Sequence, residues 1–221
     1  TVGPRRATLA RVPGVTADGS VRHIYMHVPF CGRRCSYCDF AIAVRRTVPW
    51  RAFSDAIMAE IATRALQLDP AKLKSLYMGG GTPSKLGAEG ITELLAGFAQ
   101  RLGVDNLSTL AGSAEVTIEV NPEDVTLPAV ESWVSAGVNR ASLGVQSFDP
   151  RVLQWMHREH GADDSVRAAR LLREGGIQNI SLDLIFAVPV ELERDWERDL
   201  DLVLGLEPDH LSLYGLTVEP K

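Results

Sequence analysis

All three cysteines of the chain, Cys31, Cys35 and Cys38, fall within one short stretch with the spacing C-x3-C-x2-C. An odd number of cysteines cannot pair completely as disulfides. Thiols this crowded indicate metal ligation in a reducing compartment, and we expect a cytoplasmic protein. A tight loop with three thiols can bind three corners of an iron–sulfur cube, which leaves the fourth iron open to a small molecule. The sequence therefore predicts a site-differentiated [4Fe–4S] cluster.

A structural zinc site is the alternative for the same thiols, with His27 or Asp39 as the fourth ligand. The spacing C-x3-C-x2-C directly after an expected strand is unusual for zinc. We therefore favour the cluster, and we expect His27 to support the cluster region rather than to bind metal. A purely structural loop histidine is the other interpretation.

Further along the chain, residues that could hold a polar ligand follow short apolar runs. The glycines of Gly79-Gly80-Gly81-Thr82-Pro83 allow a close backbone approach to a ligand, and exposed N–H groups there could hold a polar group. Gln146 carries both a donor and an acceptor. Glu119 and Asp183 lie in apolar strands, where a carboxylate needs donors. A plain tight turn and surface carboxylates are the alternatives.

These residues require a sheet that brings distant parts of the chain together. Strand-like and helix-like patterns alternate, which indicates βα units and a parallel sheet. Helical periodicity marks residues 50–67, 163–174 and 193–205. Six units are fewer than a closed barrel of eight, so we predict an α/β fold with a partial, open (β/α)6 barrel. The six predicted strands are His23–Val28, Ser75–Met78, Glu115–Glu119, Arg140–Val145, Asn179–Ile185 and His210–Leu216.

The composition of the 221 residues is that of a globular protein, with 45% hydrophobic and 23% charged residues. The formal net charge of −5 argues against a nucleic-acid partner. We expect no transmembrane segment, because no apolar run approaches the roughly 20 residues that would span a bilayer, and no signal peptide. We expect residues 1–20 to be a tail and residues 21–221 to be one core domain, in a chain that could be a fragment.

The run Y-x-H-V-P-F-C-x3-C-x-Y-C-D-F, from Tyr25 to Phe40, resembles the radical SAM superfamily. Within it, the resemblance is to the branch that holds oxygen-independent coproporphyrinogen III oxidase (HemN) and the haem chaperone HemW. The similarity extends from Tyr25 to Pro220. It implies a radical SAM barrel, a [4Fe–4S] cluster on the three cysteines, and S-adenosylmethionine (SAM) bound beside the cluster.

The resemblance also implies roles for single residues. The turn at Gly80, Gly81 and Thr82 would meet the methionine amino group of SAM, and Glu119 would contact the SAM moiety. Gln146 would lie at the ribose or carboxylate region. The full set of expected cofactor-binding residues is Tyr25, Tyr37, Gly80, Gly81, Thr82, Glu119, Gln146, Arg158, Asp183 and Thr217.

Arg158 falls where the family has an arginine that pairs with the SAM carboxylate, a task that suits its forked donors. A solvated cation at a helix end is the alternative. Asp183 would lie near the adenosine ribose and Thr217 near the adenine. We expect the neighbouring His157 and His160 to be surface residues.

The chain departs from the family pattern at several points. HemN has another cysteine two positions past the third, where this chain has Phe40, and a longer N-terminal segment than the residues before Tyr25. Both differences favour the HemW branch. Residues 187–192, AVPVEL, replace a turn that the family builds with glycines, which puts substrate or haem access at this rim in doubt. The family's C-terminal region and its H-N-x-x-Y-W motif are absent.

The first functional hypothesis is therefore a HemW-like haem chaperone that binds a cluster, SAM and haem and delivers haem to an acceptor protein. Only the resemblance implies haem. The alternative is a coproporphyrinogen III oxidase, in which a SAM-derived radical acts on the propionates of a porphyrinogen. A structural iron–sulfur or zinc protein that does not use SAM is a third hypothesis, which the series of polar strand ends disfavours.

Overall fold

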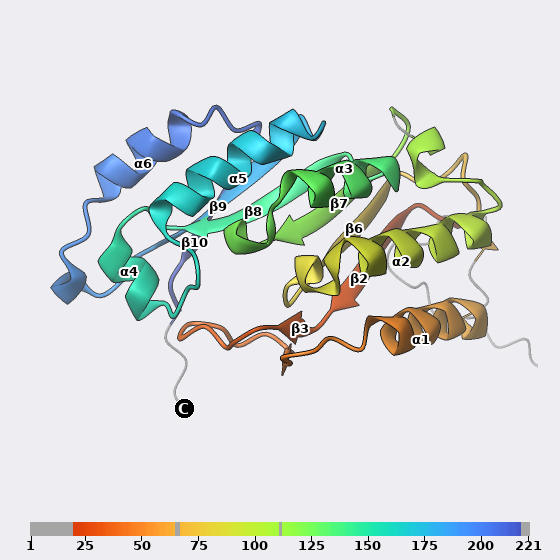
Figure 1. Cartoon of the computed structure of the whole chain (residues 1–221), viewed down its shortest axis with the longest axis horizontal. Helices are drawn as coiled ribbons and strands as arrows, with labels where there is room; N and C mark the ends of the chain where they lie inside the picture. Colours follow the sequence, from red (N-terminus) through yellow and green to blue (C-terminus); the bar gives the residue numbers. More distant parts are fainter. Residues whose placement is uncertain (1–19, 65–66, 111, 218–221) are drawn as a thin grey trace, which may run out of the picture.

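The computed structural model describes residues 20–64, 67–110 and 112–217. One parallel sheet of six strands, in the order β10-β9-β8-β7-β6-β2, runs through the molecule (Figure 1). Each strand of this sheet after β2 pairs in parallel with the strand of the sheet that comes before it in the sequence. This confirms the predicted α/β architecture with an open, barrel-like sheet. The strands are β2 (His23–Val28), β6 (Ser75–Gly80), β7 (Glu115–Val120), β8 (Arg140–Gln146), β9 (Asn179–Phe186) and β10 (His210–Gly215).

The six strands begin where the sequence pattern predicts and differ only at their ends. β6 and β8 extend to Gly80 and Gln146, whereas β10 stops at Gly215, before the predicted Leu216. Short pairs complete the strand set: β1 (Ser20–Val21) with β5 (Gln67–Leu68), and β3 (Phe30–Cys31) with β4 (Ala43–Val44).

Helices cross over between the strands: α1 (Trp50–Thr63), α2 (Gly87–Leu102), α3 (Leu127–Ser135), α4 (Pro150–Trp155), α5 (Ala162–Glu174) and α6 (Trp196–Leu204). Short 3-10 turns are η1 (Pro83–Leu86), η2 (Leu107–Leu110), η3 (Pro122–Asp124) and η4 (Val190–Leu192). The prediction for 163–174 is confirmed to within one residue.

Two predicted helix ends are wrong. The helix expected over 50–67 stops at Thr63, residues 65–66 lie outside the described part, and Gln67 already belongs to β5. The helix expected from 193 begins at Trp196, because Glu193 is in the left-handed region and the Asp195 side chain accepts the Arg198 N–H.

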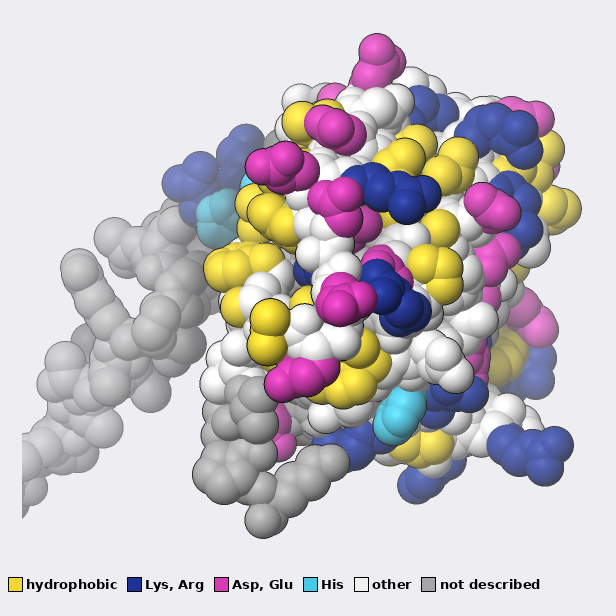
Figure 2. All heavy atoms as spheres, turned by 90° about the vertical axis from the view of Figure 1, so that its left-hand side faces the viewer, with side chains coloured by type: hydrophobic (Ala, Val, Ile, Leu, Met, Phe, Trp, Pro, Cys, Tyr) yellow, Lys and Arg dark blue, Asp and Glu magenta, His cyan; other side chains and the backbone are white. Residues whose placement is uncertain are grey.

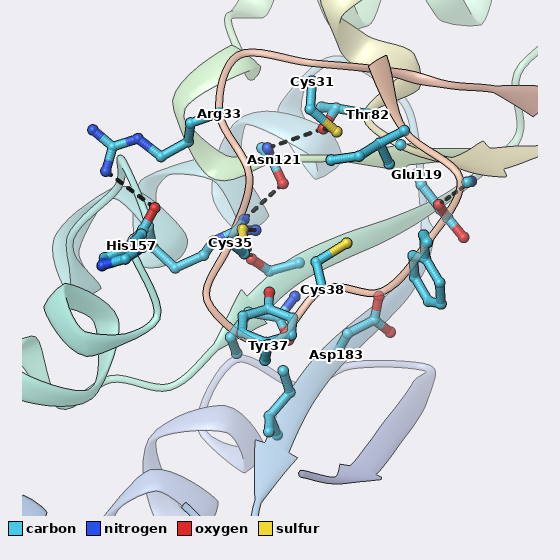
Figure 3. A pocket seen from close by; sticks show the side chains of 18 of the residues that line it. Cys31, Arg33, Cys35, Tyr37, Cys38, Thr82, Glu119, Asn121, His157 and Asp183 are labelled. Carbon is cyan, nitrogen blue, oxygen red and sulfur yellow. Dashed lines mark hydrogen bonds between the residues drawn. The ribbon is translucent and has the colours of Figure 1, made fainter. Parts of the chain in front are cut away.

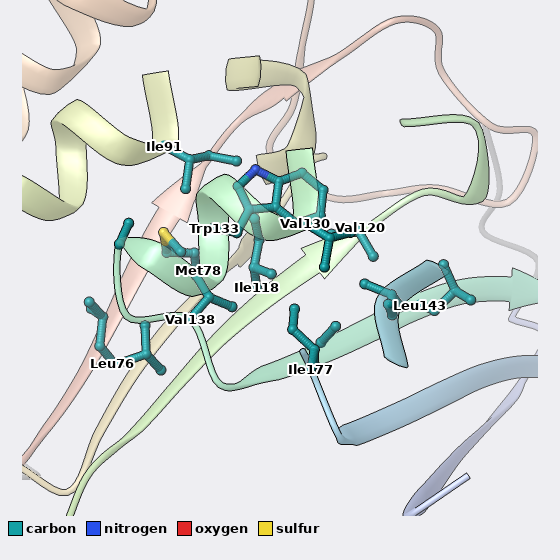
Figure 4. Close-up of a cluster of buried hydrophobic side chains, with 14 of the residues drawn as sticks. Leu76, Met78, Ile91, Ile118, Val120, Val130, Trp133, Val138, Leu143 and Ile177 are labelled. Carbon is teal, nitrogen blue, oxygen red and sulfur yellow. The ribbon is translucent and has the colours of Figure 1, made fainter. Parts of the chain in front are cut away.

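The core lies between one face of the sheet and the helices (Figure 4). Trp133 of α3 and Ile91 of α2 pack over Met78 and Ile118 of the central strands, and all four are at most 1% exposed. Burial of each such side chain stabilises the fold by about 1.5–3 kcal/mol. Alternate residues of the same strands point to the opposite face of the sheet, where polar side chains lie.

Figure 2 shows the side of the molecule on which α4 and α6 lie, where acidic side chains are interspersed with hydrophobic ones. Among the hydrophobic residues, Leu204 of α6 is 58% exposed. No helix in the described part of the chain is both long and apolar enough to cross a membrane.

Candidate functional site

The cysteine loop begins at the carboxyl end of β2 and is closed at its base. The Ala43 N–H donates to Pro29 O (2.7 Å) and the Arg45 N–H donates to Cys31 O (3.0 Å), which are the contacts that pair β3 with β4. Cys31 lies in β3, and Cys35 and Cys38 lie in the loop that this pairing encloses. The short ladder therefore holds all three thiols in one loop.

The chain just after α4 anchors the tip of the cysteine loop. Ser36 donates its N–H to Met156 O (3.3 Å) and its hydroxyl to Trp155 O (2.9 Å). Arg33 donates to His157 O (3.1 Å) and pairs with Glu159 (3.2 Å). These contacts join segments more than 100 residues apart, so the loop's position depends on the completed fold.

One cavity of about 390 Å³ lies over the carboxyl ends of the strands, beside the loop (Figure 3). Its volume falls in the range of small-molecule sites. Every predicted site residue except Tyr25 lines it: Cys31, Cys35, Tyr37, Cys38, Gly80, Gly81, Thr82, Glu119, Gln146, Arg158, Asp183 and Thr217.

The three thiols are free and partly buried. Thr82 donates to Cys31 Sγ (3.4 Å), and Arg158 donates to Cys35 Sγ (3.7 Å). Burial raises the pKa of Cys31, and the Thr82 hydrogen bond opposes this. Among the described residues, no three His, Cys, Asp or Glu side chains are close enough to share one metal ion. A cube needs each thiol at a different iron, whereas a zinc ion would need all its ligands around one point.

The glycine turn after β6 is packed tightly against the cysteine loop. Gly80 has φ of +112°, and a Cβ there would lie 2.4 Å from His27 Nδ1. At Gly81 a Cβ would lie 2.7 Å from the Pro29 backbone. The N–H groups of Gly80, Gly81 and Thr82 donate to Glu119, Val28 O and Phe30 O. The expectation that these N–H groups are exposed for a ligand is therefore wrong, because the protein uses all three.

Glu119 is held by two donors from β6. The Tyr77 hydroxyl donates to Oε1 (2.7 Å) and the Gly80 N–H donates to Oε2 (2.9 Å). Burial and the charge of Glu119 both raise the pKa of Tyr77, which therefore remains a donor. Tyr77 is not among the predicted site residues, although its place opposite the core-facing Leu76 and Met78 in the strand alternation was an available signal.

Asp183 lies on β9 beside Ser142 of β8, whose hydroxyl donates to both carboxylate oxygens (2.9 and 3.1 Å). Burial raises the pKa of Asp183 to about 6, and the nearby charge of Glu119 adds to the shift. Gln146, at the end of β8, adopts φ of +66° next to an irregularity in the β8–β9 register. This departure from the strand conformation places Gln146 in the wall of the cavity.

Arg158 is not a solvated helix-end cation. Its NH2 group donates to Asn121 Oδ1 (2.6 Å) and Gly144 O (3.1 Å). The expectation that His160 is a surface residue is wrong, since His160 is 4% exposed and its Nε2 lies 3.0 Å from Val145 O. His157 is exposed, as expected.

His27 ties the end of β2 to the chain beyond the cysteines. Its Nε2 donates to Ala41 O (2.9 Å), so Nδ1 accepts from the Tyr25 hydroxyl (3.1 Å). Both nitrogens are thus engaged, which fits a supporting position. Tyr25 stacks on Tyr77 at a centroid distance of 6.1 Å and does not line the cavity.

The loop that departs from the family pattern packs against the cysteine loop. Val188 and Leu192 join a small apolar cluster with Tyr37 and Leu216. Ala187 keeps a left-handed φ of +58° although it is not glycine, at a cost of roughly 1–2 kcal/mol. Leu216, in the same cluster, donates its N–H to Phe186 O (2.9 Å), so the loop lies beside the chain that follows β10.

A profile of the radical SAM superfamily matches residues 25–203. This range includes the cysteine loop, β6, β7, β8, β9 and all of β2 except its first two residues, but not β10. The chain belongs to the radical SAM superfamily. Membership implies a [4Fe–4S] cluster and SAM. The donor set fits this pair: three thiols surround one side of a cavity whose other walls carry carboxylates, an amide and a guanidinium.

Curated relatives within the superfamily are HemW-like. The chain is 35% identical to "Heme chaperone HemW" of Escherichia coli over 89% of its own length and 51% of that protein. It is 36% identical to the protein of that name from Mycobacterium tuberculosis H37Rv, over 97% and 54% respectively. The mouse "Radical S-adenosyl methionine domain-containing protein 1, mitochondrial" is 34% identical over 98% and 48%.

Among solved structures, coproporphyrinogen III oxidase (HemN) from Escherichia coli superposes with a TM-score of 0.78 at 29% identity, over 91% of this chain and 46% of that one. Methylornithine synthase, at 14% identity and a TM-score of 0.61, shares the fold. The chain spans about half the length of the curated relatives it matches.

Proposed function

We propose that residues 21–221 are the radical SAM core domain of a HemW-like haem chaperone, which binds haem and delivers it to an acceptor protein in the cytoplasm. The observation that carries this proposal is the 35% identity to HemW over 89% of the chain. Phe40, 69% exposed at the cavity, supports it, because the oxidase resemblance would require a cysteine there.

In this proposal Cys31, Cys35 and Cys38 bind three irons of a [4Fe–4S] cluster. The cluster supplies an open iron that SAM can chelate and an electron for its reductive cleavage. The protein's task is to hold SAM next to that iron. The neutral Thr82 hydroxyl and the Arg158 cation already contact two of the sulfurs.

The proposed SAM contacts follow the walls of the cavity. Arg158 would pair with the SAM carboxylate. The SAM ammonium is a donor, so it would need an oxygen acceptor at the glycine turn, either a backbone carbonyl or Glu119. Gln146 and Asp183 would bond the ribose and Thr217 the adenine, with Tyr25 and Tyr37 at the cluster loop.

The cluster assignment is tested with single cysteine variants. Cys31→Ala, Cys35→Ala and Cys38→Ala should each lose the four-iron EPR signal after anaerobic reconstitution, while Arg46→Ala, at an exposed position just past the loop, should keep it. In the parent protein the signal should change when SAM is added. A full cluster in all three cysteine variants would refute the ligand assignment.

The choice between chaperone and oxidase needs a second assay. We expect the reconstituted protein with SAM to take up haem stoichiometrically, measured by its absorbance, and to leave coproporphyrinogen III unchanged under reducing conditions. Formation of protoporphyrinogen would show the oxidase instead. Absence of both haem uptake and turnover would contradict both functions.

A further inference from the structure

Two polar side chains close to Arg158, Glu123 at the cavity wall and His160 behind it, take no part in the proposed ligand contacts. The His160 side chain is fully buried, and that of Glu123, in η3, is 20% exposed. Burial of such groups is costly unless they have partners. Their partners therefore indicate what these residues do.

The hydrogen bonds of His160 fix the role of each ring nitrogen. Nε2 lies 3.0 Å from the Val145 carbonyl, which can only accept, so Nε2 carries the proton. Nδ1 then faces both Arg158 NH2 and Glu123 Oε2, each at 3.4 Å. In the neutral ring Nδ1 accepts from Arg158, and the Glu123 carboxylate lies behind it as a negative neighbour of the cation.

The charge of Glu123 is maintained by this arrangement. Burial by itself would raise the pKa of Glu123, but the neighbouring His160 and the Arg158 charge lower it below its usual value. On the other side, the same NH2 group of Arg158 donates to Asn121 Oδ1 and Gly144 O. The guanidinium is thus held from two sides, with NH1 directed at Cys35 Sγ.

We propose that Glu123 and His160 are positioning residues that hold the Arg158 guanidinium against the cysteine loop. This inference rests on the proposed function only in taking Cys35 as a cluster ligand and Arg158 as a SAM contact. A fixed cation at a cluster sulfur raises the cluster's reduction potential, and a fixed fork binds a carboxylate at less entropic cost.

The test uses Glu123→Gln and His160→Gln in the reconstituted protein, with Glu131→Gln as the matched control. Glu131 is exposed on α3 and does not line the cavity. We expect each test variant to keep its cluster, to bind SAM about tenfold more weakly in an EPR titration, and to show a more negative midpoint potential. The control should match the parent in both measurements.

Unchanged SAM affinity and midpoint potential in folded Glu123→Gln protein would overturn the proposal. This variant preserves shape at a partly exposed position, so it carries the test if His160→Gln does not fold. Haem plays no part in either readout, so failure of haem uptake leaves the result intact. If the parent binds no SAM, that part of the proposed function fails and the midpoint potentials alone decide the positioning role.

Discussion

The partly buried carboxyl group of Asp183, which lines the cavity, lowers the stability of the folded protein at neutral pH. Its pKa is about 6 in the folded protein against an ordinary 3.8, chiefly because of burial. The folded state therefore retains a proton over a pH range in which the unfolded chain has released it. As the pH rises from about 4 to about 6 the protein loses stability, by at most about 3 kcal/mol, and the loss persists at neutral pH.

The variant Asp183→Asn removes this cost. We expect the cluster-free variant to be about 1–3 kcal/mol more stable than the parent at pH 7 and nearly equal at pH 4, because Asn is neutral at both. Urea unfolding at the two pH values measures the difference. The exposed Asp201 of α6 provides the control Asp201→Asn. A variant less stable than the parent at pH 7 would contradict the argument.

At the scale of elements, one buried ion pair joins the ends of β8 and β9 to the start of α6. The side chains of Arg194 and Asp199 are 4% and 3% exposed. Asp199 accepts from the Ser147 hydroxyl (2.7 Å) and the Phe148 N–H (3.0 Å), and Arg194 donates to Ile185 O. The pair therefore supports the strand ends that carry Gln146 and the rim loop.

Arg194→Ala should cost about 3–5 kcal/mol of unfolding free energy, because it leaves Asp199 buried without its cation. Arg198→Ala, on the exposed side of α6, should change stability by less than about 0.5 kcal/mol. Urea unfolding followed by tryptophan fluorescence compares the two. Equal stabilities would mean that Asp199 is adequately paired by Ser147 and Phe148 alone.

β7 was predictable because its β-branched residues Val116, Ile118 and Val120 recur with a period of two, and the other strands are also short runs rich in apolar residues. The helix end at Thr63 was not predictable, because local periodicity does not show where β5 will pair. The burial of His160 was also hidden, because its partners Val145 and Glu123 come from other elements. Contacts over such separations exist only in the folded chain.

At the scale of the whole molecule, the open sheet is unevenly covered. Five of the seven residues of β8 are buried, whereas every residue of β10 is exposed or half-buried. Among the strands that the structure describes, β10 pairs with β9 on one side only. Few buried contacts and an open edge are typical of segments that open at low free energy.

We therefore expect the amides of β10 to exchange at least about tenfold faster than those of β8 in the isolated chain. Hydrogen–deuterium exchange with mass spectrometry can compare peptides from the two strands. The other edge, β2, is an internal control, because it buries Met26 and Val28 and should be intermediate. Equal protection of β10 and β8 would show that edge exposure does not govern local opening.

The same open sheet has a mechanical consequence. A closed barrel has its curvature set by its own hydrogen bonds, but this arc is joined at neither edge among the described strands. Glu119, Gln146 and Asp183 belong to β7, β8 and β9, and Thr82 follows β6, so the four line the cavity from successive strands. A molecule that touches all four acts as a brace across the arc, so occupancy of the cavity should stiffen the sheet as well as fill the site.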